Sequence, residues 1–208
     1  MNTPRAFWNH RALNYDEAIG PVYAEAYRKT AEYTLKYLRP GDRVLEFACG
    51  TGISTVDIAP HVAHIRAIDI SEEMVTRASA KIAQAGLANV EVSQTDLFDP
   101  CLEEGSFDAV MAFNVLLYVE NFEEVMARIH SLLKPGGVFL SATDCLGWNF
   151  SKAARTKFIR SHTGKMPYVG FFSQKGLAKK IERGGFEVLE TANLFPSPPN
   201  LFVAAKKK

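Results

Sequence analysis

Apolar residues recur along this chain in two patterns, and the two patterns alternate. Short continuous apolar runs are typical of buried strands, whereas apolar residues three and four positions apart are typical of amphipathic helices. The strand pattern occurs at residues 43–48, 64–69, 90–96, 107–114, 138–144, 186–194 and 201–206. The helix pattern occurs at residues 21–38, 54–62, 71–87, 121–137 and 173–186.

Residues that favour helix ends stand at the borders of these helices. Pro21 suits a first helical turn, and Ser54, Thr55 and Ser71 suit the capping position that precedes one. Pro135 and the glycine after it are expected to end the helix at 121–137.

Strands that alternate with helices indicate a doubly wound, mostly parallel sheet. The last two strands follow each other with no room for a helix between them, so we expect them to pair antiparallel. The sequence therefore predicts an α/β fold, a three-layer sandwich with a seven-stranded sheet whose last strand is antiparallel. We expect one domain over 1–208, with a helical N-terminal cap at 1–38 and an inserted lid segment at 145–172 on the substrate side.

Charge and cysteine content narrow the function classes. The 208 residues carry a formal net charge of +1, which gives no support for a nucleic-acid-binding surface. The apolar stretch at 109–119 is too short to cross a bilayer. Three cysteines at irregular spacing match no zinc site and favour reduced thiols, so we expect a cytoplasmic protein without a bound metal.

The stretch RVLEFACGTG at 43–52 has a strand followed by a glycine-rich turn. A dinucleotide site would need a third glycine, which Thr55 replaces, and the Glu46 carboxylate would repel a pyrophosphate there. Asp69 ends the second strand, where an acid accepts hydrogen bonds from ribose hydroxyls, and Asp96 ends the third. Three acids at successive strand ends predict a ligand with a ribose and a cationic group but no phosphate.

S-adenosylmethionine fits that description. VLEFACGTG, AIDISEEMVTRA, QTDLF, FDAVMAFNVLLYV, LLKPGGVFLSAT and GGFEVLE resemble, in order, the motifs of class I S-adenosylmethionine-dependent methyltransferases. The resemblance covers about residues 30–208 and is nearest to the small-molecule enzymes grouped with ubiquinone and menaquinone biosynthesis. It implies a Rossmann-like fold and S-adenosylmethionine as the cofactor.

The resemblance also implies roles for single residues. The backbone around Ala48, Gly50 and Gly52 should approach the methionine part, and Glu46 should act on it through the turn or a water. Asp69 should hold the ribose. The remaining cofactor-binding residues implied are Ile70 and Met74 against the adenine, Asp96 and Leu97 at its edge and face, and Asn114 near the methionine amino group.

The insertion at 145–172 carries the signal for the acceptor. It contains bases and aromatic residues, among them Trp148 and Phe150, but no Asp or Glu. This composition indicates a small acceptor with aromatic or anionic character, although the bases could equally face water. The catalytic residue and the acceptor atom stay open. Candidates for a general base are Tyr118, His162, Tyr15, His10 and Asp144.

Methyl transfer to a small molecule by in-line displacement, through positioning and desolvation, is therefore the predicted function. The alternative is a protein that binds S-adenosylmethionine or S-adenosylhomocysteine without methyl transfer. A nicotinamide-dependent oxidoreductase is disfavoured by Glu46 and by the missing glycine. A nucleic-acid methyltransferase is disfavoured because FNVLLY stands where its signature would be. Oligomeric state and pathway stay open.

Overall fold

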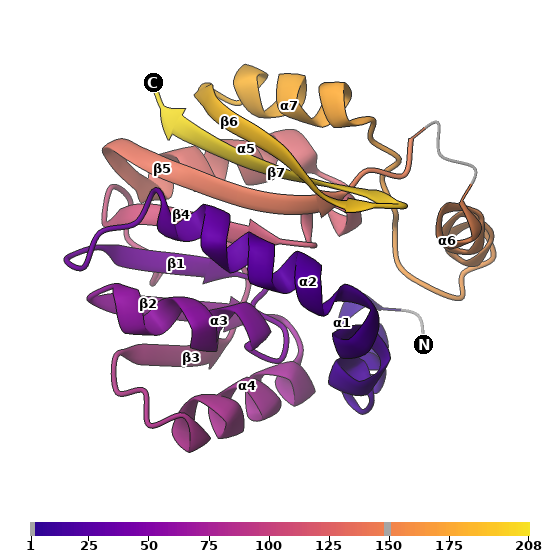
Figure 1. Cartoon of the computed structure of the whole chain (residues 1–208), viewed down its shortest axis with the longest axis horizontal. Helices are drawn as coiled ribbons and strands as arrows, with labels where there is room; N and C mark the ends of the chain where they lie inside the picture. Colours follow the sequence, from indigo (N-terminus) through magenta and orange to yellow (C-terminus); the bar gives the residue numbers. More distant parts are fainter. Residues whose placement is uncertain (1–2, 148–150) are drawn as a thin grey trace.

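The computed structural model describes residues 3–147 and 151–208, and within them seven strands form one sheet. The strand order is β3-β2-β1-β4-β5-β7-β6 (Figure 1). The first five strands run parallel, and β7 pairs antiparallel with both β5 and β6. The strands are β1 Arg43–Phe47, β2 His64–Asp69, β3 Val90–Gln94, β4 Phe107–Phe113, β5 Leu133–Asp144, β6 Phe186–Pro196 and β7 Pro199–Lys207. The predicted fold is confirmed.

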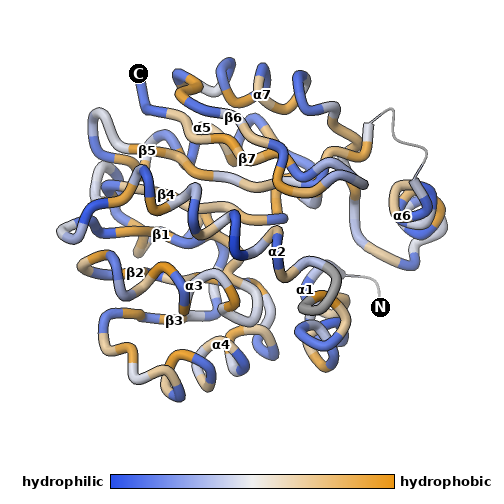
Figure 2. Tube along the Cα trace, viewed as in Figure 1, coloured by the Kyte–Doolittle hydropathy of each residue, from blue (hydrophilic) through white to orange (hydrophobic). Residues whose placement is uncertain are grey.

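Helices cover both faces of this sheet. Two apolar clusters show the layers, because one joins α2, α3 and α4 to the strands and the other joins α5 and α7 to them. Figure 2 shows the strands apolar along much of their length. The helices are α1 Pro4–Ala12, α2 Tyr15–Leu35, α3 Ile53–Ile58, α4 Glu72–Gln84, α5 Phe122–Leu132, α6 Lys152–His162 and α7 Gln174–Arg183, with 3-10 turns η1 Ala59–His61 and η2 Leu116–Tyr118.

The inner strand β1 shows why the sheet needs helices on both faces. Val44 and Leu45 point to opposite faces and neither is exposed to solvent. Glu46 is only 2% exposed, so a carboxylate has been placed where the pattern calls for an apolar residue. A buried carboxylate is costly unless it is bonded or protonated, which marks this strand end as a place with a specific role.

Three helix boundaries differ from the sequence-based expectation. The helix predicted from Pro21 begins at Tyr15, because Asp16 and Glu17 supply an acidic first turn and the helix continues past the proline. The helix predicted from Ser54 begins at Ile53, with Gly52 at the capping position. Ser54 and Thr55 are therefore not caps but are buried inside α3, where the Thr55 hydroxyl binds the Glu46 carboxylate.

The third difference concerns Pro135. Helix α5 ends at Leu132, and β5 begins at Leu133 because that residue pairs with Phe107 of β4. By contrast, the predicted cap of α4 is confirmed, since the Ser71 hydroxyl accepts a hydrogen bond of 3.1 Å from the backbone N–H of Met74.

Helices α1 and α6 both lie beyond the same end of the sheet, where the parallel strands have their carboxyl ends, and they are separated from each other (Figure 1). Ligands of doubly wound sheets bind at this end. Trp148 and Phe150 of the predicted insertion lie outside the described residues. Within the described part of the chain, no helix is long and apolar enough to span a membrane. The division of the chain into a cap at 1–38 and a lid at 145–172 stays a prediction.

Candidate functional site

A tight turn connects β1 to α3 and carries three left-handed residues, Ala48, Gly50 and Gly52, with φ angles of 58°, 56° and 77°. A Cβ at Gly52 would lie 3.3 Å from Ala78 of α4, so glycine lets the turn sit directly against that helix. The N–H of Cys49 donates to the Ile68 carbonyl at 3.0 Å, which holds the turn beside β2. The turn is therefore fixed at the ends of two neighbouring strands.

Asp69, at the end of β2, holds this turn from the other side. One carboxylate oxygen accepts a hydrogen bond of 2.9 Å from the N–H of Gly50, and the other accepts one of 2.8 Å from the N–H of Ser71. Burial raises the pKa of Asp69, although these N–H donors act in the opposite direction. The carboxylate thus links the glycine turn to the first turn of α4 and still borders a cavity.

Glu46 lies behind the turn. Its carboxylate accepts a hydrogen bond of 2.6 Å from the Thr55 hydroxyl. Burial raises its pKa to about 7 and outweighs the Thr55 hydrogen bond, which lowers the pKa, while the nearby Asp69 carboxylate adds a smaller upward contribution. Glu46 does not line the cavity, so its influence there is electrostatic and passes through the turn.

A cavity of about 520 Å³ opens in front of the turn. Among the described residues that line it there are three acids, Asp69, Asp96 and Glu120, and no Lys, Arg or His. We call it the acidic cavity. Eight of the ten residues expected at the cofactor line it, namely Ala48, Gly50, Asp69, Ile70, Met74, Asp96, Leu97 and Asn114. Glu46 and Gly52 are the two that do not.

Asp96 has a local role as well. Its carboxylate accepts a hydrogen bond of 2.7 Å from the N–H of Phe98, which shapes the turn after β3. The Phe98 side chain is 48% exposed and lies at the rim of the acidic cavity. The sequence did not predict Phe47 and Phe98 as lining residues, and the exposure of the Phe98 ring is a signal that only the structure provides.

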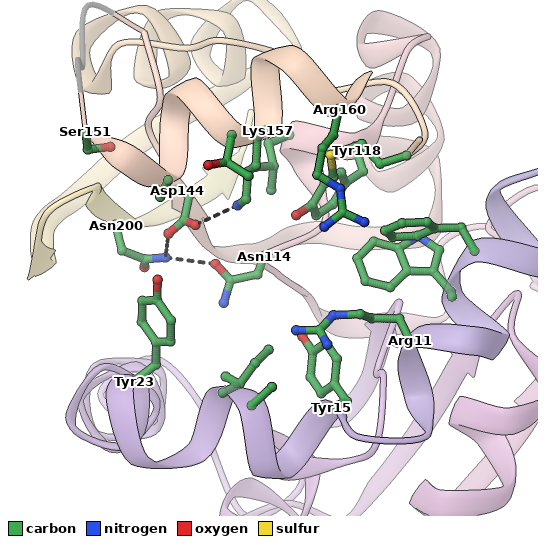
Figure 3. A pocket seen from close by; sticks show the side chains of 18 of the residues that line it. Arg11, Tyr15, Tyr23, Asn114, Tyr118, Asp144, Ser151, Lys157, Arg160 and Asn200 are labelled. Atoms are coloured by element: carbon green, nitrogen blue, oxygen red, sulfur yellow. Dashed lines mark hydrogen bonds and ion pairs between the residues drawn. The ribbon is translucent and has the colours of Figure 1, made fainter. Parts of the chain in front are cut away.

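A second and larger cavity of about 1230 Å³ lies between α1 and α2 on one side and α6 on the other (Figure 3). Its described lining includes Lys and Arg residues and a single carboxylate, Asp144, and we call it the basic cavity. Aromatic rings form much of the rest of its wall. The bases are Arg11, Lys152, Lys157, Arg160 and Lys165, and the rings are Phe7, Trp8, Tyr15, Tyr23, Tyr27 and Tyr118.

The two cavities meet. Four residues line both of them, Trp8, Tyr15, Asn114 and Tyr118, and we call this set the junction. The rings of Trp8 and Tyr118 pack edge to face with centroids 5.0 Å apart, so α1 closes onto η2 at this point. Asn114 adopts a left-handed φ of 55°, which turns the chain sharply after β4.

A polar network supports the junction from behind. The amide nitrogen of Asn200 on β7 donates to Asn114 Oδ1 at 2.8 Å and to Asp144 Oδ1 at 3.0 Å (Figure 3). Lys157 Nζ of α6 lies 3.1 Å from Asp144 Oδ2. The network therefore connects α6 to the residue between the cavities. Asn200 and Lys157 were not predicted, because no local pattern relates them to Asn114.

The candidate bases are placed differently from one another. Tyr15 and Tyr118 belong to the junction, whereas His10 and Asp144 line only the basic cavity. Burial raises the pKa of Tyr15 well above its ordinary value, which keeps that phenol protonated. His162 lines neither cavity and stacks on Phe158 at the outer part of α6, with ring centroids 4.1 Å apart.

The acidic cavity fits S-adenosylmethionine on its own chemistry. The buried Asp69 carboxylate suits ribose hydroxyls, the absence of bases among its described residues disfavours a phosphate, and three acids favour a cation. Ala48, Gly50 and Asn114 line the same cavity, and Ile70, Met74 and Leu97 add apolar side chains to its lining.

The chain is similar to known methyltransferases in sequence. Residues 44–137, from β1 to the start of β5, match a family model described as a methyltransferase domain. A sterol 24-C-methyltransferase of Gibberella zeae is 33% identical over 104 residues, which are 49% of this chain and 27% of that protein. A demethylmenaquinone methyltransferase of Listeria monocytogenes is 26% identical over 161 residues, 73% of this chain and 68% of that protein.

The chain thus spans about a quarter of the length of the first relative and about two thirds of the second. A solved structure of geranyl diphosphate methyltransferase in complex with S-adenosylmethionine superposes with a TM-score of 0.70 at 16% identity, over 86% of this chain and 85% of that one. At that identity the superposition shows a shared fold. Residues 44–137 thus match a methyltransferase domain, and the named relatives and the shared fold make the chain similar to class I S-adenosylmethionine-dependent methyltransferases.

Proposed function

We propose that this protein transfers a methyl group from S-adenosylmethionine in the acidic cavity to a small molecule in the basic cavity. The observation that supports this most directly is the junction. The junction residues line both cavities. A ligand in one cavity can therefore place a reacting group directly against a ligand in the other, with no solvent layer between them.

When bound, S-adenosylmethionine supplies a methyl group on a positively charged sulfur. The residues of this chain then have three tasks. Asp69 binds the ribose, Asn114 and the backbone of Ala48 and Gly50 position the methionine part, and Ile70, Met74, Asp96 and Leu97 enclose the adenine.

The rings at the junction would orient the acceptor and exclude water. Displacement at a methyl group needs the attacking atom in line with the bond that breaks, so positioning and desolvation supply most of what the protein contributes. Of the two tyrosines at the junction, Tyr118 is the candidate that we retain as a proton acceptor. Tyr15, with its raised pKa, is better suited to donate a hydrogen bond than to remove a proton.

The relatives' names support small apolar acceptors. One relative is named for demethylmenaquinone and another for a sterol. The aromatic wall of the basic cavity fits a flat or unsaturated body of that kind, and its bases fit an anionic group. An acceptor with aromatic or anionic character is therefore proposed here, and a nucleic acid is not, because the bases lie inside a cavity and not along an extended face.

Two further points stay at the level of proposal. The cysteines Cys49, Cys101 and Cys145 are all unpaired, which supports a cytoplasmic setting. The alternative function is a protein that binds the cofactor without methyl transfer. It would not explain why the basic cavity lies next to the junction.

Methyl transfer is tested by incubating the protein with S-adenosylmethionine labelled on the methyl group and a panel of phenols, quinols, sterols and organic acids. We expect labelled product from at least one acceptor class and tight binding of S-adenosylhomocysteine by calorimetry. Tight binding with no product across the panel would favour the binding protein. No binding of either nucleoside would overturn the assignment of the acidic cavity.

A further inference from the structure

The basic cavity has a charge composition unlike that of the whole chain. The chain has a formal net charge of +1, with 24 Lys and Arg residues against 23 Asp and Glu. The described residues that line this cavity include five Lys or Arg and one acid. This local excess is large, and cavities lined by one sign of charge concentrate ligands of the opposite sign.

The single acid, Asp144, does not neutralise the excess positive charge of the cavity, because it already forms an ion pair. Asp144 pairs with Lys157, whose side chain is 23% exposed, and also accepts a hydrogen bond from Asn200. This pair is part of the wall that supports Asn114. The charge that remains comes from Arg11, Lys152, Arg160 and Lys165.

Two of these bases stand out by position. Arg11 projects from α1 and Arg160 from α6, and Figure 3 shows both guanidinium groups directed into the cavity from opposite walls. Within the described part of the chain, neither forms an ion pair with a carboxylate. Arg11 donates only to the neutral Asn14 amide, at 3.0 Å. A guanidinium has five N–H donors arranged to bind a carboxylate or phosphate in two-point fashion.

The position of these two arginines relative to the junction indicates how a bound ligand would be oriented. Arg11 lies over the ring of Tyr15, 5.9 Å from its centroid, and Tyr15 belongs to the junction. A ligand whose anionic end rests between Arg11 and Arg160 would thus extend along aromatic rings toward Tyr118 and Asn114. The opposite charge of the two cavities also keeps the two ligands apart, since an organic anion is repelled from the acids around the cofactor.

We propose that the basic cavity holds an oxyanion subsite formed by Arg11 and Arg160, and that the methyl acceptor is an organic anion with a carboxylate or phosphate group at a distance from the atom that is methylated. The proposal rests on the proposed function, because it deepens the account of the acceptor. It differs from a general preference for anions in naming the two residues and the end of the molecule that they bind.

The experiment measures binding of three matched probes by calorimetry, with the protein saturated with S-adenosylhomocysteine at low ionic strength. The probes are phenyl phosphate, benzoate and benzyl alcohol. We expect the two anions to bind and the neutral alcohol to bind at least tenfold more weakly. The tighter of the two anions identifies the phosphate or the carboxylate as the natural group. Addition of salt should weaken anion binding and leave the alcohol unchanged.

The variants are Arg11→Gln and Arg160→Gln, with Arg155→Gln as the matched control. Arg155 lies on the same helix as Arg160, carries the same charge and does not line the cavity. Each of the first two changes should weaken anion binding about tenfold, while Arg155→Gln leaves it within twofold. Equal binding of alcohol and anions, or an equal effect of Arg155→Gln and Arg160→Gln, would overturn the subsite.

The same measurements separate this proposal from the proposed function. If S-adenosylhomocysteine binds and methyl transfer occurs but the anions do not bind, the subsite is wrong and the enzyme assignment stands. If the nucleoside does not bind, the anion titrations are repeated on the free protein. Anion binding that depends on Arg11 and Arg160 would then support the subsite without the methyltransferase.

Discussion

The Thr55 hydroxyl donates a hydrogen bond of 2.6 Å to the Glu46 carboxylate, and both side chains are buried behind the glycine turn. This one donor does not offset the loss of water around the carboxylate. Burial, with a further contribution from Asp69, raises the pKa of Glu46 to about 7 from an ordinary value of 4.5. Glu46 therefore changes its charge near neutral pH, beside the site where we place a cation.

The first prediction concerns stability of the free protein. A carboxyl group with a higher pKa in the folded chain binds more protons there, so the free energy of unfolding falls as pH rises from 4.5 to about 7. Glu46→Gln should lose less stability than the parent between about pH 5 and about pH 8, by up to roughly 3 kcal/mol. Denaturant unfolding at the two pH values measures this, with the exposed Glu187→Gln as control. If the difference in unfolding free energy between Glu46→Gln and the parent were the same at both pH values, the prediction would be wrong.

The second prediction concerns cofactor affinity. The sulfonium of S-adenosylmethionine should favour the ionised form of Glu46, so its affinity should rise with pH up to about 7 and then level off. The affinity should rise by up to about tenfold, because the glycine turn separates the Glu46 carboxylate from the sulfonium and weakens their attraction at moderate dielectric. Glu46→Gln should flatten the profile. S-adenosylhomocysteine, which lacks the sulfonium, should show a weaker pH dependence, and equal profiles for the two nucleosides would contradict the prediction.

The third prediction concerns Asp69, which accepts N–H bonds from Gly50 and Ser71. Asp69→Asn places an NH₂ group against one of these donors and removes the charge that would hold the ribose. We expect S-adenosylhomocysteine to bind about tenfold to a hundredfold more weakly, the effect typical of one charged hydrogen bond. Calorimetry tests this, with Asp57→Asn on the exposed side of α3 as the control. A similar loss in both variants would point to general charge and not to this contact.

Much of the fold follows from local pattern. The alternation of strands and helices predicted the sheet, and the uninterrupted order of the last two strands predicted their antiparallel pairing. The boundaries that were wrong depend on partners far along the chain. Leu133 joins β5 because Phe107 is its neighbour, and Thr55 lies inside α3 because Glu46 needs its hydroxyl. Helix-capping preferences depend only on residues nearby in the sequence, so they cannot predict either of these long-range partners.

The site divides in the same way. Asp69 and Asp96 could be predicted because the carboxyl ends of parallel strands meet at one edge of a sheet. Arg11 and Asn200 could not, since each reaches the cavity from an element outside that rule. Asn200 bonds Asn114 across 86 residues of sequence, on the antiparallel strand β7. Long-range contacts of this kind depend on the tertiary fold and produce no periodic pattern in the sequence from which they could be predicted.

The fourth prediction separates crowding from backbone strain in the glycine turn. Gly52 and Gly86 both have a left-handed φ, of 77° and 67°, but only Gly52 has a neighbour within reach of a Cβ, Ala78 at 3.3 Å. Each alanine substitution should cost about 1–2 kcal/mol for the left-handed backbone. Gly52→Ala should cost more than Gly86→Ala and should also weaken cofactor binding. Urea unfolding measures the difference, and equal costs would show that α4 yields to the added methyl.

The fifth prediction concerns the pair of Asp144 and Lys157, whose side chains are 14% and 23% exposed. Asp144→Asn removes the one carboxylate among bases and leaves the Lys157 ammonium without a counter-charge, so we expect a loss of about 2 kcal/mol, below the cost for a fully buried pair. Lys157→Met should cost less, because Asn200 still donates to Asp144. The double variant should recover part of the loss of Asp144→Asn, which a double-mutant cycle by urea unfolding detects as a coupling energy. Purely additive costs would mean that the ion pair adds nothing to stability and that α6 is held by its apolar contacts, Ala154 against Leu117 and Leu146 among them.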